Sequence, residues 1–344
     1  MSDEAGDELG AQAIEDVLAA VDAPEGRDPL RDDAGRLRLS FTRVDTFEQC
    51  PRRFRYQYVD GLPQAPAPQL SFGSSIHGAL EWLYDRKHPE LPSLDDTLQA
   101  LFDAWDSTGY AEVDRDEQVR AYAHARDVVS AFHGRVTAEG FRLPAATEAW
   151  FELPVGEDIV VVGAIDRVDV DDDGQLHVVD YKTNRRARSR SQVRGSLQLA
   201  IYALATRELY GRLPATVALD FVVPGVRVEV PVTELDLDAV PARLISAAER
   251  IRAGEDTPTP NRLCDWCDFR AICPAWAEGG ATDPDDTGPF GRAVQERTRL
   301  QRSVVRDARR LRQLDAAIER LSSEIADMAG GAATSATRSE GPHA

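Results

Sequence analysis

Lysine is nearly absent from this chain of 344 residues. Lys87 and Lys182 are its two lysines, so arginine supplies the rest of the 40 strongly basic residues. Long apolar runs are missing as well, and none approaches the ~20 residues that a membrane-spanning helix requires. The opening MSDEAGDELG is acidic and lacks the apolar stretch of a secretion signal. We therefore expect a cytoplasmic protein without a membrane partner.

Cysteine is scarce too, with four residues in the whole sequence. In a cytosolic chain, such a small set indicates a metal site more than disulfide bonds. The sequence also lacks the G-x4-G-K-[ST] pattern of a P-loop ATPase. If the protein acts on a nucleic-acid duplex, any unwinding must therefore come from a partner.

Acidic residues are abundant, and the formal net charge is −19. A surface of that sign generally repels nucleic acid, so local clusters of arginine are more informative than the total. NRRARSRSQVR follows Lys182 closely and has no acid, and CPRRFRYQY alternates arginines with aromatics. Arginines for phosphates and aromatics for bases suit single-stranded DNA, although pairing with the abundant acids is an open alternative. The candidates are Arg52, Arg53, Arg185, Arg186, Arg188, Arg190 and Arg194.

The hydrophobic pattern predicts a mixed α/β domain. Helices are expected in a short segment that carries Cys50 and over 72–87, 94–107, 115–139, 196–209 and 236–253. Strands are expected over 146–155, 158–170, 175–182, 215–223 and 226–232. DDDG and Pro224-Gly225 are hairpin turn signals between successive strands.

Composition divides the chain into one globular domain and its flanking segments. Apolar residues recur every seven positions between Val304 and Ile325, which is typical of a coiled coil. This helix either packs on its own domain or mediates self-association or binding to a helicase. The expected segments are an acidic disordered tail at 1–38, a globular domain at 39–278, a linker at 279–290, an amphipathic helix at 291–329 and a disordered tail at 330–344.

Lys182 stands two residues after Asp180 in a predicted strand, so the two side chains share a face. Asp166, in the strand before the hairpin, joins them only if the paired residue numbers sum to an even value. Two carboxylates can bind Mg²⁺ or Mn²⁺, and the metal can polarise a phosphodiester and activate a water. A nearby lysine can orient or deprotonate that water, whereas arginine stays protonated. The alternative is a lysine that faces solvent at a strand end.

Four motifs, in their order and spacing, resemble the PD-(D/E)XK nuclease superfamily and in particular its RecB-type branch. That branch includes the nuclease domains of RecB and AddB and the CRISPR adaptation nucleases. LSFTRVDTFEQCPRRFRYQYVDGL is also similar to the N-terminal segment of this branch, and the resemblance covers residues 39–278. The motifs are Gly73-x3-His77, Gly163-Ala164-Ile165-Asp166, Asp180-Tyr181-Lys182 and Gln198-x3-Tyr202.

The resemblance implies a restriction-endonuclease-like core, in which helices flank a mixed β-sheet. It implies a deoxyribonuclease, of exonuclease or endonuclease mode, that hydrolyses phosphodiester bonds with Mg²⁺ or Mn²⁺. Its substrates would be single-stranded DNA or DNA ends in recombination or repair. Two alternatives stay open: a catalytically inactive DNA-binding scaffold with the same fold and cluster, and a CRISPR spacer-acquisition nuclease.

The resemblance also implies roles for individual residues. Lys182 would be the catalytic lysine, and Gln198 and Tyr202, on one face of a helix, would support the site and the DNA. Glu148 is either a further acidic member of the site or a solvated residue at a sheet edge. A neutral imidazole among the ligands favours Mn²⁺ over Mg²⁺. The metal ligands would be His77, Asp166, Asp180 and the backbone carbonyl of Tyr181.

All four cysteines fall into one pattern, Cys264-x2-Cys267-x5-Cys273, about 210 residues after Cys50. Four thiolates suit a zinc ion or an iron–sulfur cluster, and the spacing does not separate the two. One early and three late cysteines resemble the iron–sulfur staple of AddB-like and CRISPR adaptation nucleases, which implies a [4Fe–4S] cluster. Its role would be structural, because it would clamp the two ends of the domain together.

Overall fold

A mixed β-sheet organises the part of the chain that the structure describes. The computed structural model describes residues 30–62, 64, 67–111 and 113–276. The strands of this sheet are β1 Leu37–Leu39, β2 Ala146–Val155, β3 Ile159–Val170, β4 Leu176–Lys182, β5 Thr216–Phe221 and β6 Val226–Pro231. Their order is β1-β3-β4-β5-β6, and β2 pairs along β3.

Strand β3 is shared by three neighbours. Its first residues pair in parallel with β1, its last residues pair antiparallel with β4, and β2 runs antiparallel along most of its length. Beyond β4, the β5 strand is parallel and β6 is antiparallel. The turn between β3 and β4 contains Gly174 at a φ of 74°, a backbone conformation that glycine adopts without steric cost.

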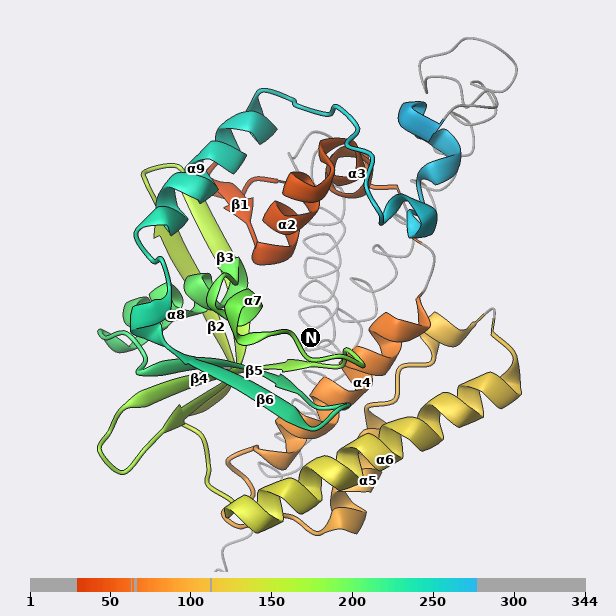
Figure 1. Ribbon diagram of the computed structural model, residues 1–344, viewed down its shortest axis with the longest axis vertical. Coiled ribbons are helices and arrows are strands. Elements are labelled where there is room, and N and C mark those ends of the chain that lie inside the picture. The colour runs from red at the N-terminus through yellow and green to blue at the C-terminus, as the bar shows by residue number, and fades with distance from the viewer. Residues whose placement is uncertain (1–29, 63, 65–66, 112, 277–344) are drawn as a thin grey trace, which may run out of the picture. The chain divides into compact units, whose positions relative to one another are not determined.

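Helices cover both faces of the sheet (Figure 1). Helices α4, α5 and α6 pack with Val179 and Tyr181 of β4 in one buried cluster, whereas α2, α8 and α9 pack with the other face. The candidate metal ligands on the strands therefore lie between these two buried clusters. The helices are α2 Phe41–Gln49, α3 Pro51–Phe54, α4 Pro68–Leu83, α5 Leu94–Asp103, α6 Arg115–Glu139, α7 Arg190–Arg194, α8 Leu197–Tyr210 and α9 Ala239–Arg252.

The predicted mixed α/β class, with helices flanking a mixed sheet, is confirmed. Several boundaries differ from the prediction. Helix α4 begins at Pro68 instead of residue 72, because proline is pre-organised for a first helical turn. Strand β1 is too short to leave a pattern in the sequence, and it overlaps the expected tail 1–38. Leu30 and Leu37 are buried, so the folded region begins earlier than predicted.

Three predicted segments fall outside the described residues. They are the linker 279–290, the amphipathic helix 291–329 and the tail 330–344. In the part of the chain that the structure does describe, no helix combines the length and the apolar character needed to cross a lipid bilayer.

Candidate metal centre

Asp180 and Lys182 lie side by side on β4, with Lys182 Nζ 2.6 Å from Asp180 Oδ2. Residue numbers paired between β3 and β4 sum to an even value, so continuation of the register sets Asp166 opposite Asp180. The backbone N–H of Tyr181 donates a hydrogen bond of 2.7 Å to Asp166 Oδ2. The structure therefore brings both carboxylates and the lysine together where β3 and β4 separate.

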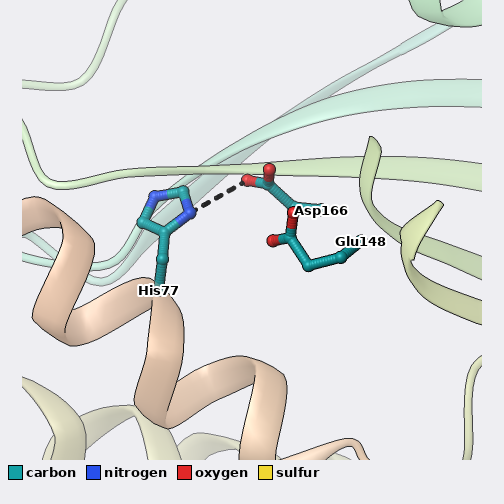
Figure 2. A group of neighbouring side chains, drawn as sticks. All are labelled: His77, Glu148 and Asp166. Carbon is teal, nitrogen blue, oxygen red and sulfur yellow. Dashed lines mark ion pairs between the residues drawn. The ribbon is translucent and has the colours of Figure 1, made fainter. Parts of the chain in front are cut away.

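Two further side chains approach Asp166 from other elements. Figure 2 shows His77 reaching it from a helix, with Glu148 on the neighbouring strand. His77 Nδ1 lies 3.5 Å from Asp166 Oδ2, and possible ligand atoms of His77, Glu148 and Asp166 lie within 4.8 Å of one another. Asp180 is outside this trio, and its carboxylate instead contacts Lys182 and Gln198. The sequence left open whether Glu148 belongs to the site, and the structure sets it beside two of the candidate metal ligands.

The position of His77 depends on a close contact of α4. Gly73 lies one helical turn before His77, and a Cβ atom at Gly73 would come within 3.3 Å of Thr183 Oγ1. Thr183 directly follows β4. The absence of a side chain at Gly73 therefore lets α4 approach the end of the strand that carries Asp180 and Lys182.

The backbone is distorted where Glu148 and Asp166 meet. Among the described residues, Glu148 is the one non-glycine residue in the left-handed region, with a φ of 44°. Strands β2 and β3 pair on both sides of this point. Ile165 and Val168 pack into the same buried cluster although they are three residues apart, so the alternation of β3 is interrupted around Asp166. Such strain is typical of functional sites.

Gln198 ties the site to α8. Its side chain accepts a hydrogen bond of 3.0 Å from Lys182 Nζ, and its amide donates to Asp180 Oδ1 at 2.9 Å and to Tyr202 Oη at 3.1 Å. Gln198 and Tyr202 are four residues apart on one helix face. The amide therefore holds the lysine and the carboxylate in one arrangement.

Burial controls the protonation of the site. Desolvation, reinforced by the Asp180 carboxylate, raises the pKa of Asp166 to about 8. Desolvation followed by the nearby Glu81 carboxylate raises the pKa of Glu148. Desolvation lowers the pKa of His77, which favours the neutral imidazole that can bind a metal.

These groups fit a divalent cation. Three carboxylates, from β2, β3 and β4, lie close together here, and within the described region Lys182 is the one cation in direct contact with them. Asp180 Oδ2 is buried and forms no hydrogen bond of normal geometry, although Lys182 pairs with it. Oxygen ligands suit Mg²⁺ and Mn²⁺, and the imidazole of His77 adds a preference for Mn²⁺.

The arginines expected to contact DNA have different surroundings. Arg52 pairs with Asp256, and Arg190 pairs with Glu234, so acids of the domain already engage both. Arg53 is half-buried, and it lines a cavity that the four cysteines also line. Of the candidate arginines, four are exposed and form no ion pair within the described residues: Arg185, Arg186, Arg188 and Arg194.

The cysteines meet where the early and late parts of the domain join. Tyr56 Oη donates to the backbone oxygen of Ile272 at 3.0 Å, and Asn261 Nδ2 donates to that of Gln49 at 3.1 Å. Burial raises the pKa of the Cys267 thiol. The residues that line this cavity of about 40 Å³ include Cys50, Cys264, Cys267 and Cys273.

Two buried charges were not predicted from the sequence. Arg167 is 4% exposed and pairs with Asp169, and Asp220 is fully buried and pairs with Arg135 and Arg227. A usable signal was present, since Asp220 interrupts an otherwise apolar strand and therefore needs a buried partner.

Comparisons with known proteins place the chain in a family. The gene 69 protein of Mycobacterium phage D29 is 26% identical over 271 residues, covering 69% of this chain and 96% of the phage protein. The crystal structure of SSO0001 is 17% identical with a TM-score of 0.35, covering 78% of this chain and 96% of that one. A family model matches residues 38–274, which include the trio of His77, Glu148 and Asp166 as well as Lys182. The chain therefore belongs to the PD-(D/E)XK nuclease superfamily.

Proposed function

We propose that this protein is a metal-dependent deoxyribonuclease of the RecB/AddB-like branch, acting on single-stranded DNA or DNA ends in recombination or repair. Membership of the nuclease superfamily supports hydrolysis of phosphodiester bonds. The observation that carries the proposal is the convergence of His77, Glu148 and Asp166 beside the Asp180–Lys182 pair. An intact set of this kind argues against the inactive DNA-binding scaffold.

His77, Glu148 and Asp166 would hold the cation, with Asp180 next to them. When bound, the cation supplies Lewis-acid polarisation of the phosphodiester and lowers the pKa of a water. The protein contributes a fixed frame for these ligands. Gln198 binds both Asp180 and Lys182, and burial lowers the pKa of His77, which favours the neutral imidazole.

Lys182 lies where its ammonium group can contact a substrate phosphate. Its side chain is 24% exposed, so Nζ can reach a substrate while Asp180 and Gln198 hold it. A compact ammonium at that point can neutralise negative charge that develops on the phosphate. The exposed arginines at 185, 186 and 188 directly follow, and they can bind neighbouring phosphates of the same strand.

The decisive experiment compares the two lysines of the chain. We expect Lys182→Ala to lower Mn²⁺-dependent digestion of labelled single-stranded DNA by at least ~100-fold, because a charge-stabilising donor is lost from the site. Lys87→Ala is the matched control, since Lys87 is 84% exposed and pairs with Asp85. Digestion by Lys182→Ala at the wild-type rate would refute the site. Cleavage of closed circular duplex DNA as fast as of linear single-stranded DNA would refute the substrate preference.

The cysteines support a [4Fe–4S] cluster as a structural clamp. All four cysteines line one cavity, where the early and late parts of the domain meet. Four thiolates there can hold a zinc ion or an iron–sulfur cluster. The order of one early and three late cysteines, which resembles an iron–sulfur staple, supports the cluster.

Protein prepared without oxygen tests the cluster. We expect a brown preparation that contains iron and sulfide, and we expect Cys264→Ser to lose both and to unfold at a lower temperature. Thermal unfolding measured with the metal content gives the comparison, and Ser191→Ala, on the exposed α7, is a control distant in sequence from the cysteines. A colourless preparation with one zinc per chain would contradict the cluster.

A further inference from the structure

Arg167 is a buried cation of β3 that lies beside Tyr181, whose ring also contacts the His77 ring at 6.0 Å between centres. Its side chain is 4% exposed, and its guanidinium pairs with Asp169 through contacts of 2.8 and 3.1 Å. Nη1 also donates a hydrogen bond of 2.9 Å to Tyr181 Oη. Its guanidinium carbon lies 4.5 Å from the centre of the Tyr84 ring. Nothing in the hydrolysis described above uses this side chain.

Burial of a charge needs a compensating arrangement, and this one has a particular layout. The guanidinium is a rigid planar fork, so it can hold a carboxylate and a hydroxyl in fixed directions while it stacks on an aromatic ring. Lysine could keep the charge but could not reproduce the fork. The Arg167 side chain therefore fixes the relative positions of whichever elements supply its partners.

Those elements are the ones that carry the metal site. Arg167 follows Asp166 in β3, and Tyr181 lies between Asp180 and Lys182 in β4. Tyr84 caps the C-terminus of α4, the helix that carries His77.

The contact with Tyr181 occurs at a critical place. Regular pairing between β3 and β4 ends at Arg167 and Val179, so the two strands separate just before the metal site. Beyond this point, Asp166 accepts the backbone N–H of Tyr181, while Arg167 donates to the Tyr181 hydroxyl. Two consecutive residues of β3 thus hold one residue of β4, the first through its backbone and the second through its side chain.

We propose that Arg167 is a positioning residue, which sets the distance between His77 on α4, Asp166 on β3 and Asp180 on β4 through its contacts with Tyr84 and Tyr181. This inference rests on the proposed metal site. Loss of the Arg167 contacts widens the site and weakens metal binding. It leaves the reacting groups themselves in place, so turnover at saturating metal changes little.

The test measures Mn²⁺ affinity by electron paramagnetic resonance and the Mn²⁺ dependence of nuclease activity on the full chain. Tyr181→Phe removes one oxygen and leaves the ion pair with Asp169 intact, and we expect a roughly 10-fold weaker affinity, as for other residues that orient metal ligands. Arg167→Lys should weaken Mn²⁺ affinity by at least as much. In both variants, kcat at saturating Mn²⁺ should stay within about 3-fold of wild type.

Two controls separate positioning from general destabilisation. Tyr84→Phe keeps the ring under the guanidinium and should bind Mn²⁺ as the wild type does. Arg135→Lys disrupts another ion pair with a buried carboxylate, Arg135–Asp220, which joins α6 to β5. The side-chain hydrogen bonds of Asp220 go to Arg135 and Arg227 and to none of the three proposed metal ligands. Arg135→Lys should lower the unfolding temperature without changing Mn²⁺ affinity.

The outcomes are distinguishable. Wild-type protein that binds no Mn²⁺ would refute the proposed metal site itself. Wild-type binding that is retained in full by Tyr181→Phe and Arg167→Lys would refute the positioning role alone. Equal weakening in Arg135→Lys would also refute it, because the loss would then follow stability and not geometry.

Discussion

Asp166 is the residue at which folding and function oppose each other. It is mostly buried, and both desolvation and the neighbouring Asp180 carboxylate disfavour its charged form. The hydrogen bond from the Tyr181 backbone recovers part of this cost. Without a cation, the folded protein therefore retains a proton that the unfolded chain releases at much lower pH.

The pH dependence of stability should reveal this proton. Because the pKa of Asp166 rises from an ordinary value near 3.8 to about 8 on folding, its contribution is fully present below pH ~4 and is lost as pH rises toward 8. In EDTA, wild-type protein should lose more stability between pH 5 and 8.5 than Asp166→Asn, by up to a few kcal/mol.

Thermal unfolding at both pH values measures the difference. Asp173→Asn, an exposed residue of the β3–β4 turn, is the control and should follow the wild type. If Asp166→Asn has the same decrease in unfolding temperature as the wild type, the carboxyl is not protonated in the folded protein.

At the scale of elements, the sequence predicted strands better than their distortions. Alternation located β2, β3 and β4 within about two residues, and it left the parity of the β3–β4 register open. The structure supplies the even register. The backbone distortion at Glu148 has no local signal, because it arises from pairing with β3, and so the role of this glutamate could not be decided from the sequence. Arg167 was missed for a similar reason, since two of its partners, Tyr84 and Tyr181, come from α4 and β4.

The approach of α4 to β4 gives a prediction at this scale. Gly73→Val places a branched side chain against Thr183 and should push the His77 turn away from Asp166. Because a displacement of ~1 Å in an active site can cost up to about 100-fold in rate, we expect kcat/KM to fall by at least ~10-fold. Gly134→Val is the matched control, since a Cβ at Gly134 on α6 meets nothing within 4 Å. A similar loss in both variants would point to helix destabilisation instead.

At the scale of the whole molecule, the charge distribution is uneven. The net charge of −19 opposes DNA binding, and the exposed arginines after β4 reverse the sign locally, next to Lys182. Counting arginines in the sequence could not separate those that face solvent from those, like Arg52 and Arg190, that pair with acids across the fold.

Salt dependence distinguishes these two kinds of arginine. Replacing Arg186 and Arg188 together by alanine should reduce the slope of log affinity for single-stranded DNA against log salt by about 1.4, or ~0.7 for each phosphate that is no longer neutralised. Arg190→Ala should leave the slope nearly unchanged, because Glu234 already engages Arg190. Fluorescence anisotropy in Ca²⁺ without Mn²⁺ or Mg²⁺ gives both slopes, and equal slopes for all variants would exclude phosphate binding by this pair of arginines.

The contact between Tyr56 and Ile272 spans 216 residues of sequence. During synthesis, the hydroxyl of Tyr56 therefore has no partner until nearly the whole domain has left the ribosome. Bringing such distant segments together carries a large loop-closure entropy, and it becomes favourable once the sheet has folded and shortened the path between them. We therefore expect the region around the four cysteines to close late in folding, after Ile272 has been synthesised.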